Sequence, residues 1–234
     1  MTRDIERAIE KLYETFSVYP FKSTMEGCPC CVSNSDKEKI HSKPLKALEE
    51  EDISRYAFKA MTTWGDIQDF KHYLPRIFEL TATTDFIVGS FVVLGKLEYG
   101  KWRTWPQEEQ AIIENFLYTW WTDNITSKPY FDKNLFFEIL KLTHNLDKLL
   151  ESWSINVADQ SFIKYVDFVH EHYTDLINKQ SEFKDLDQDS WDKLISWTKL
   201  NSGKLEEGFF YYEDRDKDLI EKISTTLYIF EHTI

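Results

Sequence analysis

Three cysteines lie together in the sequence Cys28-Pro29-Cys30-Cys31, and the chain has no others. The spacing of Cys28 and Cys31 lets two thiolates point at one tetrahedral metal ion from a tight turn, a geometry that zinc uses widely. A closed zinc site needs four ligands, and the sequence has no second pair of cysteines with this spacing. We therefore expect a zinc ion held by Cys28 and Cys31, with further ligands from elsewhere in the chain.

Several side chains are candidates for the remaining ligands. His41 is the nearest histidine in the sequence, and Cys30 can serve if the backbone turns sharply. His72 and His144 come from predicted helices, and Asp69 offers a carboxylate. The residue types and their spacing leave these alternatives open.

Asp66, Asp69 and His72 follow one another at intervals of three residues. On a helix each is a neighbour of the next, so the group could bind a divalent metal or perform acid–base chemistry. Asp66 also stands where a helix is expected to begin after Gly65. A carboxylate there accepts hydrogen bonds from the free N–H groups of the first turn, which explains the pattern without chemistry.

A thiol-redox site is a second interpretation of the cysteines. A helix predicted to begin near residues 33–36 would stabilise a thiolate at its N-terminus and lower the pKa of a nearby cysteine. A thioredoxin-like protein, however, needs strands that alternate with helices, and this sequence does not predict them. A third interpretation is that the cysteines are buried or incidental.

Sequence motifs of the common enzyme classes are absent. The chain has no glycine-rich phosphate loop, no G-x-S-x-G, no H-E-x-x-H and no set of protein-kinase motifs. This absence favours a non-catalytic protein that binds a protein partner. The alternative is a metal-dependent enzyme, in which the cysteine, histidine and aspartate groups described above hold a metal with an open position.

The charge and hydropathy of the chain limit its partners. The net charge is −13, without a cluster of lysine and arginine, so the electrostatic field repels phosphate backbones and argues against a nucleic-acid partner. A basic protein surface or a metal cation would be attracted instead. No apolar run reaches the about 18 residues that indicate a membrane span, and the N-terminal stretch lacks the apolar core of a signal peptide. We therefore expect a cytoplasmic protein.

Periodic apolar residues predict an all-α fold. Glycine and proline are scarce, with 7 and 6 residues, which argues against an all-β chain. We expect one domain over residues 1–234 with a cysteine-containing loop at 23–34, built as an irregular helical bundle or as stacked helix pairs. The predicted helices cover residues 3–16, 33–40, 52–61, 106–121, 131–151, 160–178, 189–200 and 216–231, together with one that begins at Asp66.

Three segments have less regular patterns. Pro75 is expected to kink or end the helix that begins at Asp66, because proline lacks an N–H and its ring clashes with the preceding turn. Residues 86–98 suit a buried strand or a buried helix, and the lack of a partner strand favours the helix. Residues 201–218 are predicted to form a loop or a short extended piece.

The first half of the chain resembles a family of uncharacterised bacterial proteins. The resemblance lies in C-x-x-C-V-S, K-P-L, D-x-S-R-Y-A-F-K-A-M-T-T-W-G-D and D-F-K-H-Y-L-P-R-I-F-E-L between residues 28 and 80, and in W-x-x-W-P-x-E near residue 102. It implies no activity, since none is known for the family, and it does not extend beyond about residue 125. The pattern is built on Cys28, Cys31, Tyr56, Trp64, Gly65, Asp66, Asp69, His72 and Pro75.

Cys30 and His41 lie outside this pattern. The resemblance therefore favours His72 over His41 as the third ligand. The resulting expectation is a zinc ion bound by Cys28, Cys31 and His72.

Overall fold

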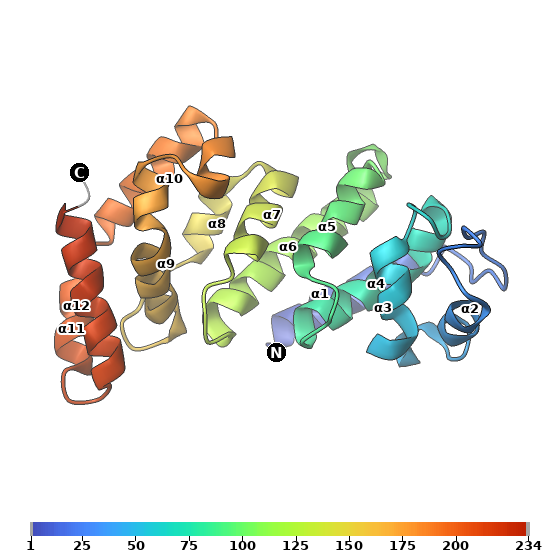
Figure 1. The fold of residues 1–234 in the computed structure, drawn as a ribbon, viewed down its shortest axis with the longest axis horizontal. Coiled ribbons are helices and arrows are strands. Elements are labelled where there is room, and N and C mark those ends of the chain that lie inside the picture. The colour runs from blue at the N-terminus through green and yellow to red at the C-terminus, as the bar shows by residue number, and fades with distance from the viewer. Residues whose placement is uncertain (1, 233–234) are drawn as a thin grey trace. The chain divides into compact units, whose positions relative to one another are not determined.

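The computed structural model describes residues 2–232, and the regular structure within them is helical (Figure 1). No β-strand occurs in this range, although isolated bridges join Gly27 and Ala60 to Trp64. The predicted all-α fold is confirmed. The α-helices are α1 (Arg3–Phe16), α2 (Asn34–Ile40), α3 (Glu50–Lys59), α4 (Ile67–Thr83), α5 (Ser90–Tyr99), α6 (Gln107–Ser127), α7 (Lys133–Thr143), α8 (Leu146–Ser152), α9 (Gln160–Ile177), α10 (Gln188–Leu200), α11 (Gly203–Tyr212) and α12 (Lys217–His232). Three 3₁₀-helices are η1 (Leu45–Ala47), η2 (Trp102–Thr104) and η3 (Ser181–Asp185).

The chain divides into two compact units. Unit 1 comprises Met1–Trp120 with Lys141–Thr143, and unit 2 comprises Trp121–Leu140 with His144–Ile234. All three cysteines belong to unit 1. The expectation of one domain over residues 1–234 stays a prediction, and each unit is described by itself.

Unit 1 is organised around α4, which packs against α1 and also contacts α3, α5 and η1 (Figure 1). Its first turn begins at Asp66, whose carboxylate accepts hydrogen bonds from the backbone N–H groups of Gln68 and Asp69. These bonds satisfy donors that a helix otherwise leaves free. The largest fully buried side chains of this unit include Phe16, Tyr56, Trp64, Phe70, Phe78, Trp102 and Phe116.

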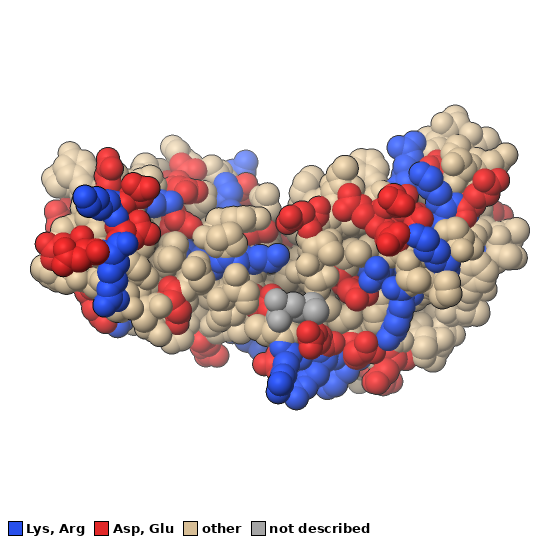
Figure 2. Space-filling model, turned by 90° about the horizontal axis from the view of Figure 1, so that it is seen from below, with Lys and Arg blue, Asp and Glu red and all other residues tan. Residues whose placement is uncertain are grey.

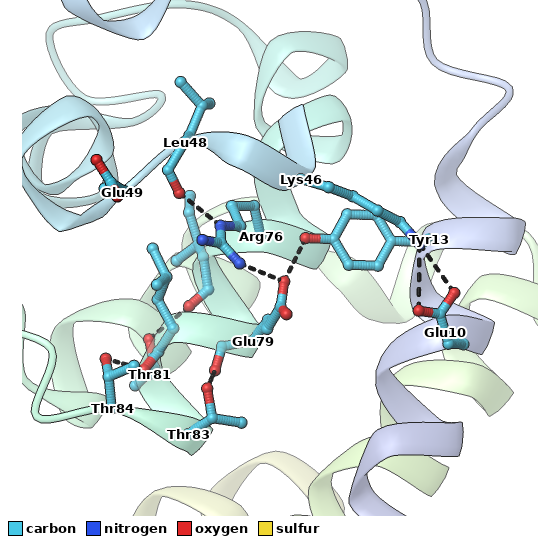
Figure 3. A network of polar contacts seen from close by, with 12 residues as sticks. Glu10, Tyr13, Lys46, Leu48, Glu49, Arg76, Glu79, Thr81, Thr83 and Thr84 are labelled. Atoms are coloured by element: carbon cyan, nitrogen blue, oxygen red, sulfur yellow. Dashed lines mark hydrogen bonds and ion pairs between the residues drawn. The ribbon is translucent and has the colours of Figure 1, made fainter. Parts of the chain in front are cut away.

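A polar network fixes α4 to the elements on either side of it (Figure 3). Arg76 donates to the carbonyl of Leu48 at 2.6 Å and to the carboxylate of Glu79 at 2.7 Å. The hydroxyl of Tyr13 on α1 donates to the same carboxylate. Burial raises the pKa of Tyr13, and the Glu79 carboxylate raises it further, so the phenol remains a donor. The helix that carries Asp66, Asp69 and His72 is thereby held in place.

Unit 2 is built on α9, which packs against α10, α11 and α12 (Figure 1). Inside it, the ammonium of Lys164 is fully buried and donates to the carbonyl of Lys128, just after α6 ends. This contact satisfies a carbonyl at a helix C-terminus. The core side chains of the unit include Trp121, Phe136, Trp153, Phe162, Tyr165, Phe168 and Tyr173.

Several predicted helix boundaries were wrong. The helix predicted over residues 131–151 is two helices, because His144 adopts a left-handed conformation with φ 52° and ends α7. Asn145 then caps α8 by accepting from the N–H of Lys148 at 3.1 Å. The segment 201–218, predicted as a loop or extended piece, contains α11. Its Tyr212 ring stacks on Phe162 with ring centroids 6.0 Å apart.

The ends of three other helices also differ from the expectation. Pro75 lies inside α4 and does not end it, since the helix continues to Thr83. The buried side chains of Leu74 and Ile77 anchor the helix on both sides of the proline, which explains why one lost hydrogen bond is tolerated. The segment 86–98 is helical as expected, although α5 begins only at Ser90, and α6 extends to Ser127.

No helix among residues 2–232 combines the length and apolar character needed to cross a membrane.

Candidate metal centre

The cysteine loop is joined to the turn that precedes α4. The backbone N–H of Cys28 donates to the carbonyl of Thr63 at 2.8 Å, and the N–H of Gly65 donates to the carbonyl of Glu26 at 2.7 Å. Gly27 lies between these bonds and pairs with Trp64. A Cβ at Gly27 would lie 3.2 Å from Cγ2 of Val32, so a larger residue here would require the Val32 side chain to shift.

The four residues of the cysteine motif form a tight turn. The N–H groups of Cys31 and Val32 both donate to the carbonyl of Cys28, at 2.9 and 3.0 Å. Pro29 occupies the second position of this turn, where its fixed φ is favourable. The turn brings all three thiols together, because their sulfur atoms lie within 4.8 Å of one another. Cys30 is exposed, and Cys28 and Cys31 are half-buried.

The sulfur–sulfur distances provide a test of the fit to a metal ion. Zn–S bonds of about 2.3 Å in a tetrahedron separate two sulfur atoms by about 3.8 Å. The sulfurs of Cys30 and Cys31 are 3.7 Å apart, which matches this value. Those of Cys28 and Cys30 are 2.9 Å apart, so they would have to separate by about 0.9 Å, a movement open to an exposed side chain. Three thiolates are ligands that zinc and other thiophilic metals prefer.

The pKa values of Cys28 and Cys30 shift in opposite directions. Hydrogen bonds from the Cys30 thiol, and from the backbone N–H groups of Cys30 and Cys31, lower the pKa of Cys28. The hydrogen bond to Cys28, with a second to Cys31, raises the pKa of Cys30 to about 11. The arrangement thus favours a thiolate at Cys28 beside a thiol at Cys30. A metal ion that binds all three sulfurs would release the proton of Cys30.

His72 does not lie in the thiol group. Its Nδ1 is 2.9 Å from the carbonyl oxygen of Tyr19, and its ring packs between Phe21 and Tyr73 at centroid distances of 6.0 and 4.7 Å. The structure thus brings Cys28 and Cys31 together with Cys30, and it places His72 against the segment that follows α1. The position of Tyr19 near α4 is a tertiary contact that no local sequence pattern predicts.

The two other histidine candidates also lie outside the thiol group among the described residues. His41 ends α2 and packs edge-on against Phe21, with ring centroids 5.2 Å apart. Burial lowers the pKa of His41, and its Nε2 is buried without a hydrogen-bond partner in the described chain. His144 belongs to unit 2, where it forms the turn after α7.

Asp66 and Asp69 form a capping box with an ion pair. The N–H of Asp66 donates to the Asp69 carboxylate at 2.9 Å, and the Lys22 ammonium lies 2.9 Å from both carboxylates. Burial raises the pKa of Asp66, but the hydrogen bonds from Lys22 and from backbone N–H groups outweigh it, so the pKa falls below its ordinary value. The capping interpretation accounts for both carboxylates, and His72 on the same helix serves a different contact.

Aromatic side chains from the sequence pattern support the cysteine loop. The ring of Trp64 packs edge-on against Tyr56 at 5.3 Å, and Tyr56 lies 4.8 Å from the ring of Tyr73. All three are buried, and their polar atoms have no hydrogen-bond partner in the described chain. The sequence singled out Tyr56 and Trp64 by their pattern, but it did not show that they form the support of the cysteine loop.

In comparisons with protein-family models, curated proteins and solved structures, nothing matches this chain. The family resemblance therefore stays a prediction.

Proposed function

We propose that this protein is a non-catalytic interaction module that binds one zinc ion through Cys28, Cys30 and Cys31. The observation that supports this proposal most strongly is the convergence of three thiol sulfurs within 4.8 Å of one another on a single turn. Soft thiolate ligands select zinc and similar metals over magnesium or calcium. Cys30 replaces His72 as the third ligand in this proposal, because the histidine bonds elsewhere.

The zinc ion would have a structural role in unit 1. The loop that carries the thiols is joined by backbone hydrogen bonds to residues 63–65, directly before α4. A metal that fixes the three sulfurs would rigidify this junction, and its binding free energy would add to the stability of the folded unit. Among residues 2–232, no histidine or carboxylate joins the thiol group. The fourth position is therefore left to water or to a side chain of a partner.

A non-catalytic role agrees with the use of the nearby polar residues. Asp66 and Asp69 cap α4 and pair with Lys22, and His72 contacts the Tyr19 carbonyl. The two carboxylates and the imidazole that would perform acid–base chemistry are thus already used in structural contacts. We assign the protein to the cytoplasm, where reducing conditions keep thiols available for metal binding, and we take its partner to be a protein.

Cobalt(II) substitution tests the ligand set. Thiolate–cobalt charge-transfer absorption is expected on titration of the reduced full chain, with intensity that falls by a third in Cys30→Ser. His72→Ala is the matched control and should leave the spectrum unchanged. Charge-transfer absorption that is unchanged in Cys30→Ser, together with visible d–d bands that change in His72→Ala, would show that the histidine is the third ligand. Absence of charge-transfer absorption in the wild-type protein would refute the metal site.

A dithiol function is the second candidate, and it is supported by the 2.9 Å separation of the Cys28 and Cys30 sulfurs. Oxidation would join the two sulfurs and transfer two electrons and two protons to a disulfide such as oxidised glutathione, which becomes two thiols. Equilibration of the metal-free protein in glutathione buffers, followed by mass spectrometry, tests it. An intramolecular disulfide at a cytoplasmic glutathione poise would favour this candidate, and its absence would leave the metal site.

A further inference from the structure

A shallow, open groove of about 690 Å³ in unit 2 runs between α8 and α10. The floor of the groove is apolar, with Leu150 almost buried and Trp197 half-buried. Leu200, at the end of α10, is 85 % exposed and adds an apolar side chain at the edge of the groove. The Trp197 ring is fixed from below by Trp153, with ring centroids 4.9 Å apart. An apolar strip flanked by charged side chains is a surface on which one face of an amphipathic helix can pack.

The rim of the groove is acidic. Four carboxylates and one ammonium group line it, so the lining has an excess of three negative charges (four minus one). The ammonium of Lys193 bridges α8 and α10, at 2.9 Å from Asp147 and 3.1 Å from Asp189. It is therefore already neutralised by two partners. The other acidic residues of the rim are Glu151 and Asp192.

The lining of the groove is more acidic than the chain as a whole, with four carboxylates to one ammonium group against 41 acidic to 28 basic residues. On the face of the molecule drawn in Figure 2, acidic and basic side chains are intermingled. A phosphate backbone or an anionic lipid surface would be repelled by this rim, whereas lysine and arginine side chains would pair with it.

We propose that this groove binds an amphipathic helical segment of a protein partner, with leucine-like side chains on one face and lysine or arginine along its edges. The apolar face would cover Leu200 and Trp197, as helices do when they bind in grooves between other helices. The basic edge would pair with Glu151 and Asp192. This inference rests on the proposed function only in taking the partner to be a protein. The groove and the thiols lie in different units, so the test does not require the metal.

The test uses the full chain and a fluorescein-labelled peptide of leucine and lysine at helical spacing, with binding measured by fluorescence anisotropy at physiological salt. A scrambled peptide of the same composition controls for charge alone. Asp192→Lys is expected to weaken binding about fivefold through the lost and reversed ion pairs. Leu200→Ser is expected to weaken it about tenfold because apolar contact area is lost.

Two matched variants lie elsewhere in unit 2. Asp214→Lys makes the same change of net charge at an exposed turn, and Phe210→Ser removes a side chain that is 73 % exposed. Both should bind the peptide within about twofold of wild type, a change typical of surface sites outside the interface. Equal weakening by Asp214→Lys, or equal binding of the scrambled peptide, would overturn the proposal in favour of unspecific attraction. No binding of the helical peptide would overturn it as well.

One further variant separates this proposal from the metal site. Cys30→Ser should leave peptide affinity unchanged. If Cys30→Ser abolishes binding while Leu200→Ser does not, the partner binds at the thiol loop and the groove is not the docking surface.

Discussion

Removal of one partner from the ion pair of Lys71 and Glu109 is expected to destabilise unit 1 strongly. The Nζ of Lys71 on α4 lies 2.7 Å from a carboxylate oxygen of Glu109 on α6, and both side chains are only 6 % exposed. The hydroxyl of Tyr19 donates to Glu109 and accepts from Lys71 at 2.9 Å. The ammonium also lies 4.3 Å from the centre of the Trp105 ring. The pair thus joins α4 and α6 to the segment that follows α1.

The size of the expected destabilisation follows from the burial of both charged side chains. Lys71→Met leaves the Glu109 carboxylate buried with Tyr19 as its remaining partner, and breaking such a pair costs about 3–5 kcal/mol. The double variant Lys71→Met with Glu109→Leu removes both charges, so the cost of their desolvation disappears as well. We expect the double variant to lie within about 1 kcal/mol of wild type, so that it regains at least about 2 kcal/mol of the stability lost in Lys71→Met. Lys46→Met is the control, because Lys46 pairs with Glu10 at 2.9 Å on the surface and should cost less than about 1 kcal/mol.

The assay is urea denaturation followed by far-UV circular dichroism, combined with hydrogen exchange of the α4 amides. Exchange reports on unit 1 directly, which matters because the two units need not unfold together. A loss below about 1 kcal/mol in Lys71→Met would refute the reasoning, because the pair would then behave as a surface ion pair. A double variant as unstable as the single one would refute it equally, since apolar replacement would not have relieved any charge burial.

Two further predictions concern unit 2. A methyl group at Gly208 would lie 2.0 Å from the Cζ atom of the fully buried Phe162. Gly208→Ala should therefore lower the free energy of unfolding by about 3 kcal/mol, measured by urea or thermal denaturation. Gly203→Ala is the control and should leave the stability unchanged, because a Cβ there would have no atom within 4 Å. Burial lowers the pKa of Lys164 from 10.5 to about 8. Between pH 8 and pH 10.5 the unfolded chain therefore binds more protons than the folded protein, so the free energy of unfolding should rise with pH. The gain is about 2 kcal/mol from pH 7 to about pH 9.5, and it should vanish in Lys164→Met when the urea midpoints of both proteins are compared across that range. Equal slopes in the two proteins would contradict a buried, charge-bearing lysine.

Much of the fold could be predicted because it depends on local patterns. The apolar spacing of Ile5, Ile9, Leu12 and Phe16 predicts α1 with its observed bounds. The break after α7 depends on a left-handed His144, a conformation that the residue type does not require. The helix α11 depends on the packing of Gly208 and Tyr212 against Phe162, which lies 46 and 50 residues earlier in the chain. Contacts of that kind override a polar local sequence.

In the candidate site, too, local spacing predicted some features, while contacts between distant residues determine others. The spacing of the cysteines predicted a thiol cluster, because a short loop keeps these side chains close together. Whether Cys30 joins the cluster depends on how the turn from Cys28 to Cys31 is closed, which the spacing did not settle. The location of His72 depends on the Tyr19 carbonyl, 53 residues away in the sequence, and no periodicity encodes such a contact.

The measurement that tests the central claim most directly is the zinc content of the full chain, purified without a metal-affinity tag, with reactive thiols counted on the same sample. The three-thiolate site predicts about one zinc per chain. All three cysteines should be protected from alkylation until a chelator is added, and they should then react together. A metal-free protein whose three thiols react at once in the folded state would contradict the site.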